Sequence, residues 1–147
     1  AFRKPEVIAE MVKEFGPEKV TVAIDVDHNQ TMPSGYEVYI DGGRTATGAD
    51  AVDWARRVDS FGVPVILPTS KAADGAKTGY DLPLIRALKD ATSAEIVASG
   101  GAGTMEHFYE AVEAGATILL AASVFHYQMI GIPELKEQLR ARGVNVG

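Results

Sequence analysis

Four short apolar runs, each followed by a helix-like segment, constrain the fold of this chain more than any other feature. Val, Ile, Leu and Ala dominate the runs, which cover residues 19–25, 63–70, 95–98 and 117–122. Continuous apolar strands are typical of parallel sheets that are covered by helices. The repeat is close to the roughly 30 residues of a βαβ unit. We therefore predict an α/β fold whose parallel strands are buried on both faces.

The remaining segments predict helices and one excursion from the sheet. Helical apolar spacing covers residues 5–16, 48–62, 80–91, 104–114 and 133–143. After the first strand, the alternating segment 36–40 ends at Asp41-Gly42-Gly43, which predicts a hairpin. A first helix without its own strand suggests that the chain is cut from something larger, and four parallel strands are also half of an eight-stranded barrel. We predict one domain over residues 1–147, a helix followed by four βα units: the (β/α)4 half of a TIM-type (β/α)8 barrel, with two open strand edges.

Composition excludes several classes of function. The chain has 147 residues, 46% of them hydrophobic and 23% charged, as in soluble globular domains. Its net charge of -6 argues against a nucleic-acid partner. The chain has no Cys, and its three His residues lack metal-ligand spacing, so we expect no disulfide, metal or cofactor. No apolar run reaches the roughly 20 residues of a membrane span, and no signal peptide is evident, so we expect the cytoplasm.

The segment Ser99-Gly100-Gly101-Ala102-Gly103 is the clearest candidate binding site. It follows an apolar strand and opens a helix, and the next strand ends at Ala122-Ser123. Glycines let a ligand approach the backbone, and a helix N-terminus offers unpaired N–H groups. Barrel enzymes often bind phosphate after their last two strands. We predict a phosphate site here; the alternative is that the glycines serve only the turn.

Polar residues also follow the first two strands. Asp25 comes directly after Val22-Ala23-Ile24, where partial burial of a carboxylate would suit acid–base chemistry. It could equally cap the following turn. The second strand ends at Thr69-Ser70, and Asp74-Gly75 follows in a loop that either holds a ligand, with Lys77 nearby, or is a solvated turn.

Together, the stretches "VAID", "GGRTATGADAVDWA", "DGAKTGYDLPLIRAL", "IVASGGAGTMEHFYEA" and "GATILLAASVFHY" resemble the cyclase subunit of imidazole glycerol phosphate synthase. The resemblance covers essentially the whole chain and the C-terminal half of that (β/α)8 barrel. It implies an enzyme of histidine biosynthesis that takes ammonia from a glutaminase partner. The reaction closes an imidazole ring on a phosphorylated ribotide, giving imidazole glycerol phosphate and an aminoimidazole carboxamide ribotide.

The resemblance also implies roles for individual residues. The family has two acid–base aspartates, and Asp25 occupies the fifth-strand position; the first-strand aspartate has no counterpart here. The substrate carries two phosphates, one held by each half-barrel. By resemblance, Thr69 and Asp74 lie around the substrate. The phosphate contacts would be Gly75, Gly100, Gly101, Ala122 and Ser123.

The chain departs from the family pattern in one βα unit. Lys71-Ala72-Ala73 replaces part of a "TS-x-DRDG" loop. Val65 stands where the family usually has a glutamate, which belongs to a charged gate for ammonia at the floor of the barrel. Pro68 lies inside a predicted strand, where it cannot donate a hydrogen bond. Two hypotheses follow. The chain is a cyclase half that needs a complementing N-terminal half-barrel, or it is a self-associating phosphate-binding half-barrel with little or no catalysis. A third hypothesis is that the chain is a structural fragment whose binding site is no longer used.

Overall fold

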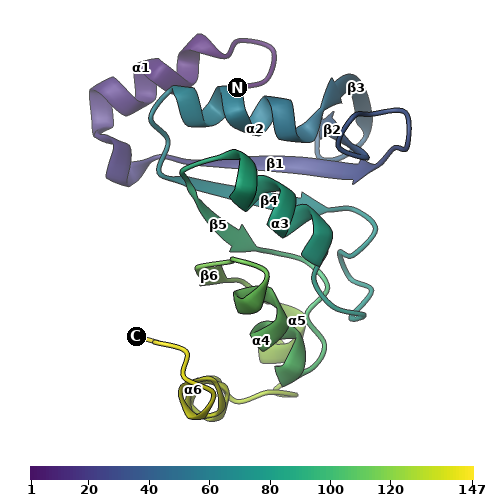
Figure 1. The fold of residues 1–147 in the computed structure, drawn as a ribbon, viewed down its shortest axis with the longest axis vertical. Helices are drawn as coiled ribbons and strands as arrows, with labels where there is room; N and C mark the ends of the chain where they lie inside the picture. Colours follow the sequence, from purple (N-terminus) through teal and green to yellow (C-terminus); the bar gives the residue numbers. More distant parts are fainter.

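A computed structural model describes residues 1–147 and contains one six-stranded sheet (Figure 1). Its strand order is β3-β2-β1-β4-β5-β6. The parallel part consists of β1 (Thr21–His28), β4 (Val65–Ser70), β5 (Glu95–Ala98) and β6 (Ile118–Leu119). A hairpin of β2 (Tyr36–Ile40) and β3 (Thr45–Asp50) adds antiparallel strands beside β1. The predicted α/β half-barrel with a hairpin after the first strand is confirmed.

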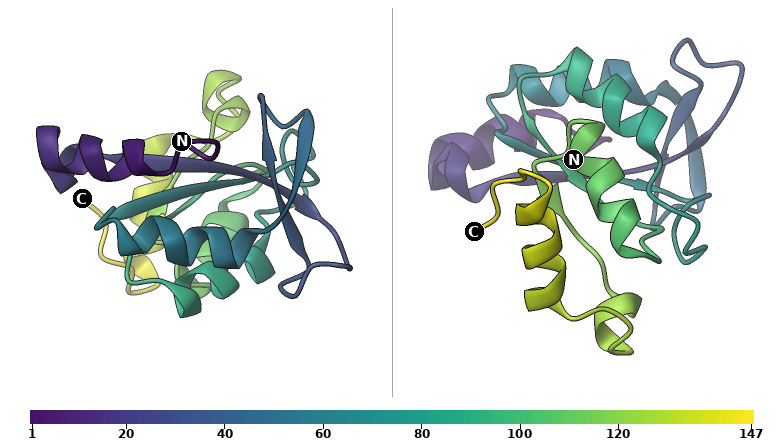
Figure 2. Two further views of the ribbon diagram at one scale, coloured as in Figure 1. Left: turned by 90° about the horizontal axis from the view of Figure 1, so that it is seen from above. Right: turned by 60° about the horizontal axis from the view of Figure 1, so that its bottom comes forward.

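The helices are α1 (Glu6–Phe15), α2 (Ala51–Ser60), α3 (Leu82–Ala91), α4 (Met105–Glu113), α5 (Ser123–His126) and α6 (Ile132–Ala141), with a short 3-10 turn, η1 (Pro17–Lys19). Of these, α2, α3 and α4 form a layer on one face of the sheet (Figure 2). Neighbours in the layer follow the strand order, because α2 contacts β1 and α3, α3 contacts β5 and α4, and α4 contacts β6 (Figure 2). None of these helices is long and apolar enough to cross a bilayer.

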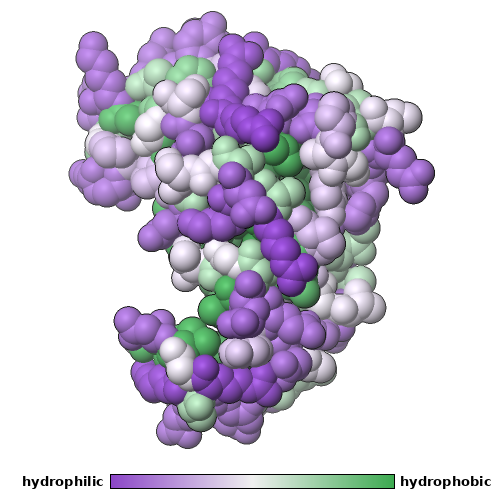
Figure 3. All heavy atoms as spheres, viewed as in Figure 1, coloured by the Kyte–Doolittle hydropathy of each residue, from purple (hydrophilic) through white to green (hydrophobic).

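The opposite face of the sheet is open, so the prediction that the strands are buried on both faces is wrong for this chain. In β1, Val22, Ile24 and Val26 are buried under the helices, whereas Thr21 and Ala23 are exposed. The same alternation runs along β4. In a barrel this second face is the interior, which four strands alone cannot enclose. The space-filling view shows a deep notch between the body and the C-terminal helix, with apolar residues on its walls (Figure 3).

The sheet also has two open edges, as predicted. On one side of β1, β2 pairs only with residues 25–28, so residues 21–24 have no partner there. A cavity of about 330 Å³ follows this unpaired edge, between β1, the end of β2 and the first three residues of the chain. At the other edge, β6 pairs only with β5.

Three local departures from the predicted elements have physical causes. The predicted helix 48–62 begins at residue 51, because Asp50 caps it and the residues before it pair with β2 as β3. The predicted strand 117–122 shortens to two residues, and the unpredicted α5 begins at Ser123. The β4–β5 ladder breaks between Ile66 and Thr69, where Pro68 has no N–H to donate.

Asp50 is expected to contribute strongly to stability as the N-cap of α2. Its buried carboxylate accepts the N–H groups of Ser34 at 2.7 Å and Val52 at 2.9 Å. Asp50→Ala should lower the free energy of unfolding in urea by about 1–2 kcal/mol, and Asp50→Asn by less, because Asn also caps.

The contribution of Asp50 should depend on pH. Burial alone would raise the pKa of this carboxyl, but the hydrogen bonds from Ser34, Asp53 and Val52 outweigh burial and lower the pKa. The stabilisation is therefore present above the unfolded-state pKa of about 3.9 and is lost as the pH falls through the lower folded-state pKa. Equal urea midpoints of the wild type and Asp50→Ala at neutral pH would contradict this role.

Candidate functional site

Seven of the residues to which the resemblance or the strand ends assigned a binding role surround one cavity of about 190 Å³, where the chain leaves β4, β5 and β6. These residues are Asp74, Gly75, Ser99, Gly100, Gly101, Ala122 and Ser123. The other lining residues are Lys77, Ala102, Leu120 and Ala121. We call this space the glycine cavity. It joins three loops that are far apart in the sequence, as the parallel strand order requires.

Several residues that line the glycine cavity have unused backbone N–H groups. The N–H groups of Gly75, Gly101 and Ser123 donate no hydrogen bond within the chain, and neither do those of Gly100 and Ala122. Backbone donors are almost always paired in folded proteins, with protein groups or with solvent. Converging free N–H groups form a concave surface that suits an oxyanion.

Glycine is required in this loop because two backbones meet there. Gly101 has a φ of 98°, and a side chain at this position would collide with the carbonyl oxygen of Gly79. The Gly79 N–H donates to the Gly101 carbonyl at 2.8 Å. A side chain at Gly103 would likewise collide with the carbonyl oxygen of Lys77. The glycines therefore hold the 74–79 loop against the 99–103 loop.

The start of α4 is capped by its own residues and lies just outside the glycine cavity. The Nδ1 atom of His107 accepts the N–H groups of Gly103 at 3.1 Å and Thr104 at 3.3 Å. The Thr104 hydroxyl in turn accepts the His107 N–H at 3.4 Å. This reciprocal cap pairs the N–H groups of Gly103, Thr104 and His107, and no residue of α4 itself lines the glycine cavity.

Asp25 and Thr69 lie on the open face of the sheet but do not line the glycine cavity; Asp25 instead lines the cavity of about 330 Å³ at the edge of β1. Asp25 is the register partner of Thr69 on β4, and Thr69 forms a parallel bridge with Ser99. The three residues thus form one row across three strands, and Ser99 is also part of the cavity wall. Asp25 lies within β1 rather than at its end, because pairing with β2 extends the strand to His28.

A second polar cluster at this end of the sheet was not predicted from the sequence. Lys71 lies after β4, with its Nζ 3.4 Å from the Asp27 carboxylate and 3.8 Å from the centroid of the Tyr39 ring. It thereby joins the ends of β1, β2 and β4. Sequence spacing could not show this contact, since it depends on the β1–β2 register.

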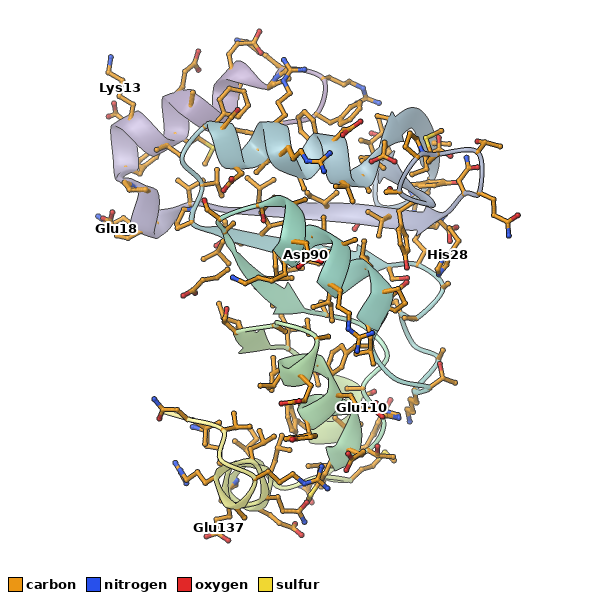
Figure 4. The ribbon with its side chains drawn as sticks, in the orientation of Figure 1. Lys13, Glu18, His28, Asp90, Glu110 and Glu137 are labelled. Atoms are coloured by element: carbon orange, nitrogen blue, oxygen red, sulfur yellow. The ribbon has the colours of Figure 1, made fainter.

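A third cluster fastens the hairpin to α3. The Asp81 carboxylate accepts the Tyr36 hydroxyl at 2.7 Å and the Ser70 hydroxyl at 2.9 Å, and lies 3.2 Å from the Nε2 atom of His28, which is labelled in Figure 4. Burial, followed by the hydrogen bond to Asp81, raises the pKa of the Tyr36 hydroxyl. These contacts support the mouth of the half-barrel. No three His, Asp or Glu side chains are grouped so that they could hold a metal ion.

Comparison with known proteins identifies the family. The family model described as "Histidine biosynthesis protein" matches residues 1–131. "Imidazole glycerol phosphate synthase subunit HisF" of Pyrobaculum aerophilum is 48% identical over 99% of this chain and 56% of that protein. The proteins of the same name from Thermobifida fusca and Nocardia farcinica are 46% and 48% identical, over 99% and 95% of this chain and 58% and 56% of their own lengths.

The chain therefore spans little more than half the length of these relatives. Nearly all of the chain is matched, so the similarity is not confined to the glycine segment. The resemblance to the cyclase subunit of imidazole glycerol phosphate synthase is confirmed, and the chain belongs to the histidine biosynthesis protein family.

Proposed function

We propose that this chain is the C-terminal half of a cyclase barrel that closes the imidazole ring of imidazole glycerol phosphate with ammonia. The relatives are named as subunits of the synthase that makes this compound. The second product would be an aminoimidazole carboxamide ribotide. The observation that carries the proposal is the glycine cavity, which is lined by residues of three loops whose backbone N–H groups have no partner within the chain.

The glycine cavity would hold one phosphate of the ribotide substrate, or inorganic phosphate. Free N–H groups of Gly75, Gly101 and Ser123 would each donate to a phosphate oxygen. Gly100 and Ala122 would add further donors. The carboxylate of Asp74 belongs to the same wall. It would contact another part of the substrate and would not bind the phosphate, because like charges repel.

The row of Ser99, Thr69 and Asp25 suggests how the substrate would extend across the sheet. Neighbouring strands are about 4.8 Å apart, so Asp25 lies roughly 10 Å across the sheet from Ser99 at the cavity wall. A ribotide with its phosphate in the cavity would extend along this row toward Asp25. We assign Asp25 as a general acid–base group, with Thr69 as a hydrogen-bonding neighbour.

Completion of the site requires a second half-barrel, either a complementing N-terminal half or another copy of this chain. The open face and both sheet edges would be covered by it. A glutaminase subunit would supply ammonia to the complete enzyme. Val65, which stands at the family's gate position, cannot form the charged gate, so an assay should supply ammonium directly. The cytoplasmic location stays a prediction.

The loop after β4 favours one alternative function. Lys71-Ala72-Ala73 lacks a carboxylate and an arginine of the family pattern, whereas the residues of the glycine cavity match it. A self-associating half-barrel that binds phosphate with little or no catalysis would have these features. Turnover measurements on a completed barrel separate the two functions.

Ala122→Asp should weaken phosphate binding by more than about tenfold, because a carboxylate on the cavity wall repels the anion. Ala122→Asn is the matched control. Both residues suit the N-cap position that Ala122 occupies before α5, so both variants should fold, and they differ only in charge. Calorimetric titration with inorganic phosphate and with glycerol phosphate measures the effect. Equal affinity of the Asp and Asn variants would place the phosphate site elsewhere.

A further inference from the structure

We propose that Lys77 is a movable ligand of the glycine cavity: its ammonium leaves Met129 and Tyr127 and pairs with the bound phosphate. This inference rests on the proposed phosphate site and adds a charged group to it. The resemblance assigns no role to Lys77.

Lys77 is positioned to balance the negative charge of a bound phosphate. It is the only basic residue among the eleven that line the cavity, and Asp74 is the only acidic one. The free N–H groups are neutral dipoles, so the lining as a whole brings no net charge to a phosphate dianion. A mobile ammonium would supply the missing charge and would offset the repulsion from Asp74.

The present contacts of the Lys77 ammonium are weak. Its Nζ lies 3.8 Å from the thioether sulfur of Met129 and 5.8 Å from the centre of the Tyr127 ring. A thioether is a poor acceptor, and no carboxylate lies within ion-pair distance of Lys77. Both partners are exposed, at 54% for Met129 and 69% for Tyr127. Little is lost when the ammonium moves to a phosphate.

The backbone of Lys77, by contrast, is held in place. Its φ of 55° lies in the left-handed region, which a residue with a side chain adopts only at a cost. Its carbonyl packs so closely on Gly103 that no side chain would fit there. The base of the side chain is therefore fixed on the cavity wall while the ammonium is free to move. Strain that is retained beside a binding site is a reason to suspect a role there.

A fixed base with a movable end has a testable consequence. The N–H groups would determine where the phosphate sits, and Lys77 would determine how strongly a doubly charged phosphate is preferred. Raising the pH through the second phosphate pKa, about 6 for phosphate esters, should therefore strengthen binding in the wild type more than in a variant without the ammonium.

The experiment compares Lys77→Met with Lys13→Met, using inorganic phosphate and glycerol phosphate. Met keeps most of the length of Lys and has a similar backbone preference, so the loop should be preserved. Lys13 points into solvent from α1 at the far end of the molecule (Figure 4). We expect affinity to fall about 10- to 100-fold in Lys77→Met, and to be unchanged in Lys13→Met. Lys77→Arg should recover most of the loss.

A second readout follows the movement itself. In the wild type, the NMR signal of the Met129 methyl group should shift as phosphate saturates the site, because the ammonium departs. Lys77→Met should show no such shift even at saturating phosphate. Unchanged affinity in Lys77→Met would overturn the inference while leaving the cavity assignment intact. If Ala122→Asp also has no effect, or the wild type binds no phosphate, the cavity assignment fails and this inference fails with it.

Discussion

Asp25→Asn should lower the rate of imidazole ring closure by about 10²–10⁴-fold in a completed barrel, with substrate affinity nearly unchanged. The amide keeps the shape of the carboxylate and removes its ability to accept and return a proton. Asp25 is half-buried on the open face, paired in register with Thr69 of β4. The expected loss is therefore in turnover, measured with ammonium supplied directly, and not in KM.

Asp27→Asn is the matched control for this prediction. Asp27 lies two residues further along β1 on the same face, where Lys71 and the His28 N–H hold its carboxylate. Its loss changes the local charge equally but removes no proposed proton carrier, so turnover should fall far less. Asp25→Asn turnover equal to that of the wild type would remove Asp25 from the mechanism. Equal losses in both variants would point to general electrostatics instead.

Most of the fold could be predicted because the strands are short and apolar and the helices have clear ends. The runs at 63–70 and 95–98 coincide closely with β4 and β5. The extension of β1 to His28 could not be predicted, because it depends on pairing with β2 across a polar loop. The open face was missed for a different reason. Apolar residues such as Leu67 suit a barrel interior, and the sequence does not show whether that interior is enclosed.

The glycine cavity could be predicted because its residues follow strands that are neighbours in the sheet. Strand order brings Gly75, Gly101 and Ser123 together although up to 48 positions, from 75 to 123, separate them. Lys71 and its partners were missed because their contact needs the hairpin register. The His107 cap had a usable signal, a Thr three residues before a side chain that can accept a hydrogen bond.

The second prediction with a large expected effect is that the isolated chain associates with itself. Residues 21–24 of β1 and the outer side of β6 have no strand partner, and the open face carries exposed Ile118 and Leu120. Open edges and exposed apolar surface favour association. Alone, the chain should therefore form a dimer or a larger oligomer at micromolar concentration, as light scattering with and without phosphate would show. A monodisperse monomer that unfolds cooperatively would contradict this.

A complementing N-terminal half-barrel should compete with self-association, because it offers the partner strands of a closed barrel. It would also supply the first-strand aspartate and the second phosphate site that the resemblance implies. The mixture should therefore contain a one-to-one complex at the expense of the homo-oligomer. An unchanged homo-oligomer in the mixture would show that the two edges do not accept such a half.

Ring closure by the mixed halves tests the central claim most directly. The N-terminal half-barrel of the Pyrobaculum aerophilum relative would be mixed with this chain, and imidazole glycerol phosphate formation would be followed with ammonium as the nitrogen source. We expect turnover in the mixture, at most trace turnover by either half alone, and loss of turnover when the chain carries Asp25→Asn. A one-to-one complex that binds phosphate and has no turnover would contradict the account and favour the binding module. Robust turnover by this chain alone would contradict the need for a second half of different sequence.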